Sequence, residues 1–243
     1  MGATDGDGGV ADPEAAVTLR VATYNIHKCK GVDGLVRPAR IAAVMQSLDV
    51  DVIAAQEVLA TQAELLESAL PGYLLHFGPA RTHAGESYGN ATFARVPIVK
   101  TANYDITHGQ REPRAVLRTD ISVEHKLLHL FNAHLGTSYF ERPHQMRCLL
   151  SESVLRAADV GEPRIVLGDF NEWVRGECSR ELMRHFNHVH VRSFPGIAPF
   201  MRLDHIYYDR QLRLIEAHVV RTGKALIASD HLPVVAEFMC NPA

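Results

Sequence analysis

Short apolar runs that stop abruptly at polar residues recur along this chain. The most informative run is residues 165–167, which has the composition of a buried strand. Gly168 follows it and permits a sharp turn, and Asp169 and Asn171 come directly afterwards. In extended geometry residues two apart face the same side, so we expect both side chains to project into a cleft. Such a pair can hold a water, a metal or a phosphate oxygen, or close an Asx turn.

Strand-like runs rich in β-branched, aromatic and other apolar residues occupy most of the remaining chain. In the middle of the chain they follow one another with only turn residues between them, which predicts a meander of mostly antiparallel strands. The expected strands are residues 19–26, 52–55, 73–77, 88–94, 98–104, 115–123, 126–132, 165–167, 203–208, 212–220 and 234–238.

Helical patterns lie on both sides of this strand-rich middle. Pro38 suits the first turn of a helix, and apolar residues recur at helical spacing behind it. Thr61 and Glu64 have the spacing of a capping box, which predicts that a second helix begins there. Further helices are expected after Pro143 and over residues 177–186. This order fits two sheets packed face to face with helices outside, an α/β or α+β fold.

The composition indicates one globular domain, because no repeat, linker or second composition regime interrupts the chain. Of the 243 residues, 47% are hydrophobic and 22% are charged, which is ordinary for a globular protein. Residues 17–243 are therefore expected to form a single domain, and residues 1–16 a disordered leader rather than a signal peptide. No apolar run approaches the ~20 residues of a membrane span. We expect a cytoplasmic protein, with a peripheral membrane role left open.

The net charge and the spacing of the cysteines disfavour some classes of protein. The net charge of −3 with neutral histidines argues against tight nonspecific binding of nucleic acid, although a nuclease with a local basic groove stays possible. Four widely spaced cysteines without a CxxC pair are typical of reduced thiols rather than of a disulfide framework or zinc site.

Polar residues recur where the expected strands begin or end. Isolated buried carboxylates are costly, so several of them at strand ends predict a shared cleft that is solvated or holds a metal. These residues fall into six short motifs: Thr23-Tyr24-Asn25, Gln56-Glu57, Asn132-Ala133-His134, Gly168-Asp169-Phe170-Asn171, Arg202-Leu203-Asp204 and Ser229-Asp230-His231.

In this order the motifs resemble the endonuclease/exonuclease/phosphatase superfamily, which includes deoxyribonuclease I, and within it an uncharacterised bacterial branch. The resemblance covers the chain from about residue 19 to its end. It implies a four-layer α/β/β/α sandwich of two mixed, largely antiparallel sheets flanked by helices. It also implies hydrolysis of phosphate esters with Mg²⁺ or Mn²⁺, since a divalent cation neutralises the phosphate charge that repels a nucleophile.

The resemblance assigns ligands and substrate contacts. Hard cations prefer oxygen ligands, so Glu57 is the expected metal ligand, helped by Asn25 directly or through water. Asp230 is a further ligand if the ion shifts or a second ion binds. Asn25 has the alternative of capping a turn, and Arg114 that of a solvated edge-strand charge. Expected substrate contacts are His27, which stands where relatives often carry an acidic residue, Arg114 and Asn90.

The remaining motif residues carry the chemistry. Asp169 would position or deprotonate the attacking water, and Asn171 would hold the phosphate. His231, paired with Asp204, would stabilise the phosphoryl group or act as the base, and the choice between Asp169 and His231 stays open. His134 would bind phosphate or protonate the leaving oxygen.

The resemblance leaves the substrate open. A phosphodiesterase or nuclease is the first candidate, and a phospholipid or sphingomyelin headgroup or a sugar or inositol phosphate are alternatives. A noncatalytic binding module on the same fold is the hypothesis from another class, disfavoured because every motif residue is present. No obligate protein partner is indicated.

Overall fold

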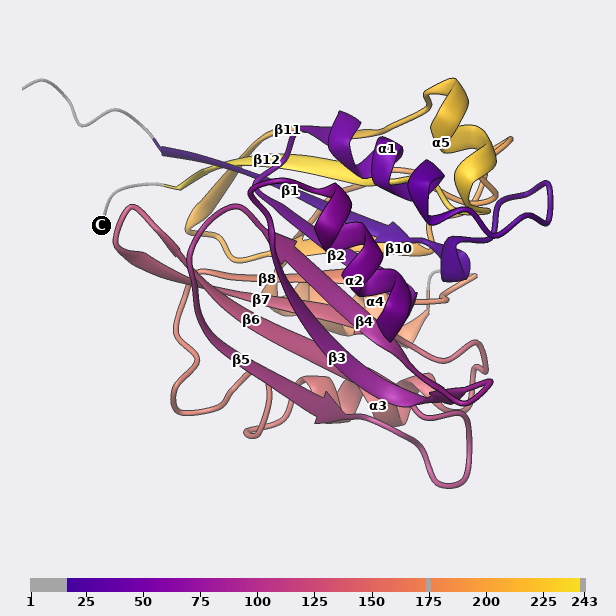
Figure 1. Cartoon of the computed structure of the whole chain (residues 1–243). Helices are drawn as coiled ribbons and strands as arrows, with labels where there is room; N and C mark the ends of the chain where they lie inside the picture. Colours follow the sequence, from indigo (N-terminus) through magenta and orange to yellow (C-terminus); the bar gives the residue numbers. More distant parts are fainter. Residues whose placement is uncertain (1–16, 174–175, 241–243) are drawn as a thin grey trace, which may run out of the picture.

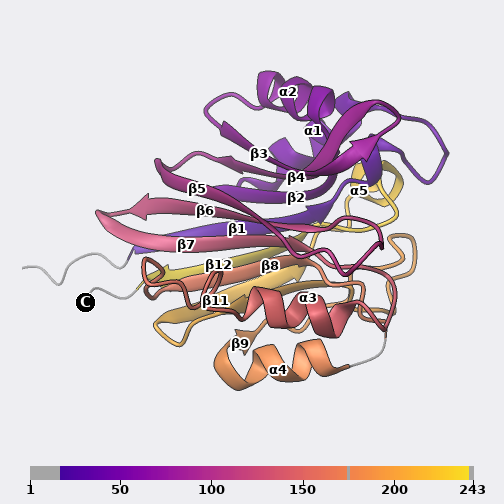
Figure 2. The same ribbon diagram turned by 90° about the horizontal axis from the view of Figure 1, so that it is seen from below.

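The computed structural model describes residues 17–173 and 176–240. In this part of the chain the strands form two six-stranded sheets that pack face to face, with helices on their outer faces (Figures 1 and 2). The predicted four-layer sandwich is confirmed. The leader expected at residues 1–16 lies outside the described residues. Within the described ranges, every helix is too short or too polar to cross a membrane.

The first sheet contains the two ends of the described chain. Its strands are β1 (Val17–Asn25), β2 (Val52–Leu59), β3 (Leu74–His83), β4 (Glu86–Ala94), β11 (Leu212–Val219) and β12 (Val234–Cys240). They are ordered β11-β12-β1-β2-β4-β3. β1 and β2 are parallel, and the other neighbours are antiparallel.

The second sheet is built from the middle of the chain. Its strands are β5 (Ile98–Asp105), β6 (Ala115–Val123), β7 (Lys126–His134), β8 (Arg164–Asp169), β9 (Asn187–His188) and β10 (Asp204–Tyr208). They are ordered β5-β6-β7-β8-β10-β9, and only β7 and β8 pair in parallel among these described strands.

Helices cover both outer faces, as Figure 2 shows. α1 (Pro38–Leu48), α2 (Ala60–Ala69) and α5 (Gly223–Ala228) pack on the first sheet, and α3 (Arg142–Leu149) and α4 (Glu177–His185) on the second. A single turn of 3-10 helix, η1 (His27–Cys29), follows β1. α1 begins at Pro38, as the sequence predicts.

β1 in the first sheet and β8 in the second are buried on both faces, which explains their continuous apolar sequences. In β8, Ile165 and Leu167 lie in the layer between the sheets, whereas Val166 packs beneath α3 and α4. In β1, Val21 faces the other sheet and Ala22 faces α1 and α2. Alternate residues of one apolar strand therefore pack into two different cores, one between the sheets and one beneath the helices.

A polar bridge joins the two sheets near one edge. Gln56 Nε2 donates to Asn132 Oδ1 at 2.8 Å, and Asn132 Nδ2 donates to the carbonyls of Ala55 and Ala91 at 3.0 Å each. Gln56 and Asn132 are fully buried. Their mutual pairing satisfies polar groups that would otherwise be costly inside the sandwich.

Two sequence expectations are wrong, and two elements were not predicted. The middle strands do not form one meander: β3 and β4 extend the first sheet, and the chain crosses to the second sheet between them and β5. Thr61 does not cap α2, because β2 runs to Leu59 and the helix begins at Ala60, where Leu59 N donates to Gln62 Oε1. Nothing in the sequence pattern predicted α5 or the short β9.

Candidate active site

The sheet topology brings the polar motifs to one edge of the sandwich. Parallel pairing of β1 with β2 puts Asn25 and Glu57 at the same edge. Parallel pairing of β7 with β8 sets His134 beside Asp169, and antiparallel β10 sets Asp204 opposite Asp169. The two sheets therefore each contribute side chains to one site, as the strand ends predicted.

A charged histidine lies between two of these carboxylates. His231 precedes β12, and its Nδ1 lies 2.8 Å from Asp204 Oδ2 and its Nε2 3.8 Å from Asp169 Oδ2. Ser193 Oγ also donates to Asp204 Oδ2. His231 is 5% exposed, and both carboxylates are 1% exposed. Burial opposes protonation of His231, but the negative charges of Asp204 and Asp169 outweigh it and raise its pKa to about 10.

Asp169 is shared by several donors. Burial raises the pKa of Asp169 to about 6, an effect that the His231 charge and hydrogen bonds from Asn171 and Asn25 only partly offset. Asn25 Nδ2 donates to Asp169 Oδ2 at 2.9 Å and to Glu57 Oε1 at 3.2 Å. The side-chain amide oxygen Oδ1 of Asn25 accepts from the backbone N–H of His27 at 2.9 Å. Asn25 thus spans the two carboxylates with its NH₂ group.

Glu57 is turned into the site by a β-bulge. The register of β2 against β4 shifts between Ala55 and Val58, and Glu57 has a φ of 57°. Consequently Gln56 points between the sheets while Glu57 faces the edge. Lys28 Nζ lies 2.5 Å from Glu57 Oε2.

The environment of Glu57 favours its ionised form. Burial alone would raise the pKa of Glu57, but the Lys28 ammonium and hydrogen bonds from Lys28 and Asn25 lower it well below its usual range. Burial and the Arg114 guanidinium lower the pKa of His134 far below its ordinary value. His134 is therefore neutral near pH 7, which leaves Lys28 as the cation that holds Glu57.

Arg114 is buried in the site and not a solvated edge-strand charge. It is 5% exposed, and its Nη1 lies 3.1 Å from His134 Nδ1. Glu112 accepts from Arg114 Nη2 at 2.9 Å. His134 Nε2 in turn lies 3.8 Å from Asp169 Oδ2. The guanidinium thus supplies positive charge on the β7 side of the cluster.

The turn after β8 departs from the extended geometry that the sequence suggested. Asn171 is left-handed with a φ of 48°, and its N–H donates to Asp169 Oδ1 at 2.9 Å, which makes an Asx turn. Asn171 Nδ2 donates to the Leu135 carbonyl at 2.9 Å. Gly168 has a φ of 139°, and a Cβ there would lie 1.8 Å from the Ala133 carbonyl oxygen. Gly168 therefore permits the close approach of β7 that positions Asp169.

The other expected site residues lie at different depths. His27 Nδ1 lies 3.4 Å from Asp230 Oδ1, and both side chains are partly exposed beside the cluster. Asn90 is 1% exposed and donates to the carbonyls of Ala115 and Asn132 across the sheets. The contacts of Asn90 are thus structural, whereas its role toward a substrate stays a prediction.

Sequence reasoning missed several residues of the site. Lys28 and Ser193 contact Glu57 and Asp204, and Phe194 packs against His231 with ring centroids 4.7 Å apart. The ring centroid of Trp173 lies 6.0 Å from that of Phe194, and Trp173 is 54% exposed. Phe194 and Trp173 thus form an aromatic wall that leads outward from His231. The position of Lys28 three residues after Asn25 was visible in the sequence, but the turn that aims its side chain was not.

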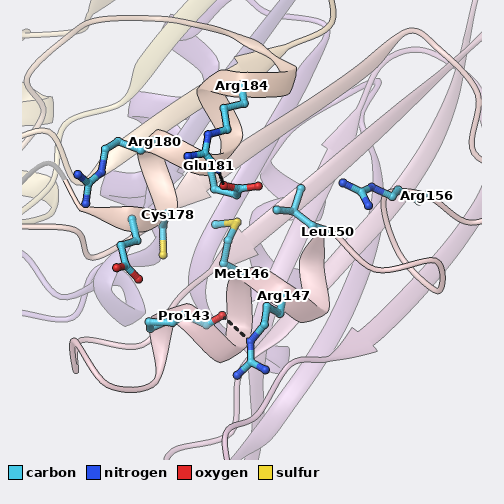
Figure 3. A pocket seen from close by; sticks show the side chains of 10 residues that line it. Pro143, Met146, Arg147, Leu150, Arg156, Cys178, Arg180, Glu181 and Arg184 are labelled. Carbon is cyan, nitrogen blue, oxygen red and sulfur yellow. Dashed lines mark hydrogen bonds and ion pairs between the residues drawn. The ribbon is translucent and has the colours of Figure 1, made fainter.

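A separate hollow lies on the outer layer between α3 and α4 (Figure 3). It has a volume of about 720 Å³ and a floor that includes Met146 and Leu150. Its rim carries Arg147, Arg156, Arg180 and Arg184, and none of the motif residues lines it. The chemistry at the strand ends is therefore distinct from this hollow.

Comparison with known proteins identifies the family. A model of the endonuclease/exonuclease/phosphatase family matches residues 22–231. The chain belongs to this family. The match confirms the resemblance drawn from the six motifs, and family members are generally phosphoester hydrolases that use divalent metals.

The chain is also similar to a curated protein and to solved structures. The uncharacterized protein YbhP of Escherichia coli K12 is 35% identical over an alignment of 162 residues, and the match covers 62% of this chain and 62% of that protein. A Beutenbergia cavernae endonuclease/exonuclease/phosphatase has a TM-score of 0.76 at 24% identity, covering 93% of this chain and 72% of that one. A Bacteroides thetaiotaomicron mannosyl-6-phosphatase has a TM-score of 0.75 at 20% identity, covering 91% and 99%. These two structures share the fold.

The donor set at the edge fits a hard divalent cation. Glu57 offers an ionised carboxylate, and Asp169 and Asp204 add carboxylate oxygens that lie within 4.8 Å of each other, whereas the protonated His231 between them is not a ligand. Asp204 Oδ1 and Arg114 Nε are buried without a hydrogen-bond partner among the described residues. Unpaired buried polar atoms are costly, so both atoms point to a bound group that the site is shaped to receive.

Proposed function

We propose that this chain is a divalent-metal-dependent phosphoester hydrolase of the phosphodiesterase or nuclease type. The observation that carries the proposal is the alignment of Asp204, His231 and Asp169, with Glu57 beside Asp169 across Asn25. Three carboxylates in different environments and one charged imidazole provide the metal ligand, the base and the cation that in-line hydrolysis of a phosphate ester needs.

Glu57 would hold Mg²⁺ or Mn²⁺, with Asp230 and Asn25 as further oxygen ligands if Asn25 turns its amide. A bound Mg²⁺ would neutralise charge on the phosphate oxygens. The role of Asn25 in the arrangement described above is to fix the distance between Glu57 and Asp169, because its NH₂ group donates to both. A carboxylate fixed in this way needs little reorganisation when the metal binds.

Asp169 is the proposed proton acceptor for the attacking water. With a pKa of about 6 it is largely ionised at neutral pH yet basic enough to take a proton. His231 is protonated there, because Asp204 and Asp169 favour its charged form, so it would face the phosphoryl charge as a cation. His134, neutral and backed by Arg114, would donate a ring N–H to a phosphate oxygen, and Asn171 would bind the same group.

The substrate classes can be ranked by the surroundings of the site. The net charge of −3 gives little support for extended nonspecific binding of nucleic acid. The aromatic wall of Trp173 and Phe194 beside His231 suits a substrate with a ring next to its phosphate. The fold neighbour named a mannosyl-6-phosphatase makes a sugar phosphate the second candidate. A phospholipid or sphingomyelin headgroup and an inositol phosphate remain further candidates.

A substrate panel tests the proposal. The purified chain is assayed with Mg²⁺, Mn²⁺ or EDTA on bis(4-nitrophenyl) phosphate, a sugar phosphate, plasmid DNA with and without abasic sites, RNA and sphingomyelin. We expect turnover of at least one member that EDTA abolishes and that Asp169→Ala removes. Turnover that persists in EDTA and in Asp169→Ala would contradict the proposal, and absence of metal binding would favour the noncatalytic binding module.

A further inference from the structure

Lys28 stands in a turn whose backbone is strained. His27, Lys28 and Cys29 have φ angles of 45°, 54° and 56°, a left-handed run that non-glycine residues rarely adopt. Strain of this kind persists only where the surroundings over-determine it, and it concentrates at functional sites. Here the buried side chain of Cys29 anchors the turn in the core, and Gln62 Nε2 donates to the Lys28 carbonyl at 2.8 Å.

The strained turn delivers the Lys28 ammonium to Glu57. Its Nζ lies 2.5 Å from Glu57 Oε2 and 5.7 Å from the centroid of the Tyr88 ring, and the side chain is 25% exposed. Arg114, another cation at this edge, is engaged by Glu112 at 2.9 Å. Glu57 thus carries the Asn25 amide on Oε1 and the Lys28 ammonium on Oε2, so a metal held by this carboxylate would lie close to the ammonium.

We propose that Lys28 is a tethered cation that occupies Glu57 in the metal-free protein, is displaced when the metal binds, and then contacts the substrate's phosphate. The inference rests on the proposed function, in which Glu57 holds the metal. An ammonium and a divalent cation repel each other strongly when they share one oxygen at close range. A lysine side chain is long and flexible, so the displaced ammonium stays within the site.

This arrangement couples the binding of the metal to the binding of the phosphate. The metal must displace Lys28, which opposes its binding, whereas a phosphate gives the displaced ammonium a new partner. Metal and phosphate should therefore bind more tightly together than separately, and by linkage each strengthens the other by the same factor. The coupling discourages the site from holding a metal without its substrate.

The test measures Mn²⁺ affinity directly, by the free-ion electron paramagnetic resonance signal, on the full chain at neutral pH. The variants are Lys28→Met, which removes the charge, and Lys28→Arg, which keeps it. Lys100→Met is the matched control, because Lys100 Nζ pairs with Asp159 Oδ2 at the same 2.5 Å but on the far surface. Circular dichroism and thermal unfolding establish that each variant is folded.

We expect Lys28→Met to bind Mn²⁺ on the order of tenfold more tightly than the wild type, as removal of one neighbouring charge predicts. Lys28→Arg should stay near the wild type, and Lys100→Met should be unchanged. Equal Mn²⁺ affinities of the wild type and Lys28→Met would overturn this inference while leaving the proposed function standing. No Mn²⁺ binding by either protein would overturn both.

A second titration tests the contact with phosphate. Inorganic phosphate is added at a fixed Mn²⁺ concentration, and the gain in Mn²⁺ affinity is compared between the wild type and Lys28→Met. A several-fold larger gain in the wild type is expected from the coupling. An equal gain in both would overturn the phosphate contact, even where the first titration supports the competition for Glu57.

Discussion

His231 Nδ1 lies 2.8 Å from Asp204 Oδ2, which fixes the ring so that Nε2 faces Asp169. Asp204→Asn would keep the shape but lose the charge that holds the imidazolium, so we expect kcat to fall by about 10²- to 10⁴-fold with little change in KM. Steady-state kinetics on the panel member that is turned over fastest measures the effect. A variant that keeps half of the wild-type kcat would show that the pair is structural.

The ionised carboxylate of Asp169 is expected to lower the free energy of unfolding. Its pKa of about 6 in the folded chain exceeds the ordinary value of 3.8, so ionised Asp169 costs folding free energy. The cost is absent below pH 4, grows as pH rises, and is complete above pH 6.

Asp169→Asn removes this cost. In EDTA we expect it to raise the free energy of unfolding by about 1–3 kcal/mol at pH 8 and to change it little at pH 4. Urea unfolding at the two pH values measures the difference. A variant less stable than the wild type at pH 8 would mean that the hydrogen bonds to the carboxylate outweigh its desolvation.

The polar bridge between the sheets should matter for stability. Asn132→Ala removes the acceptor that Gln56 Nε2 finds across the sheets, although Thr23 Oγ1 and the Ala54 carbonyl still accept from it, and removes a donor from each of two buried carbonyls, so we expect a loss of about 1–3 kcal/mol. Asn103→Ala is the matched control, because exposed Asn103 donates to only one carbonyl, that of Pro79, at 2.7 Å. Denaturant midpoints of the two variants should differ clearly, and similar midpoints would argue against the bridge.

Gly168 is the backbone position on which Asp169 depends. Gly168→Ala would drive a Cβ into the Ala133 carbonyl, so we expect at least about 3 kcal/mol of destabilisation or an insoluble protein. Gly161→Ala is the control, since a Cβ there meets nothing within 4 Å and should cost less than about 0.5 kcal/mol. Thermal unfolding compares them. A Gly168→Ala chain as stable as the control would contradict the close approach of β7 and β8.

The site residues at the strand ends were predictable because buried strands and unusual polar residues can both be recognised in the sequence. Apolar runs identify the buried strands, and the polar residues directly before or after them have few structural uses inside a sandwich. Asp169, Asp204 and His231 were found in this way. Pro38 likewise predicted the start of α1, since its fixed φ suits a first helical turn.

The features that the sequence did not predict depend on backbone geometry, which the spacing of apolar residues does not show. Lys28 and Asn171 take left-handed conformations, which turn their side chains away from where an extended chain would put them. The burial of Arg114 depends on Glu112, two residues before it in the loop that leads into β6, and on His134, which β7 brings beside it. The division of the middle strands between two sheets is likewise a nonlocal result.

The measurement that tests the central claim most directly is the rate of phosphoester hydrolysis against Mg²⁺ concentration for the wild type and Glu57→Gln. Glu64→Gln is the matched control, because Glu64 is exposed on α2. We expect a saturable Mg²⁺ dependence in the wild type and the control, and a loss of about 10²-fold or more in Glu57→Gln. A Glu57→Gln variant with the wild-type Mg²⁺ dependence and rate would contradict the account.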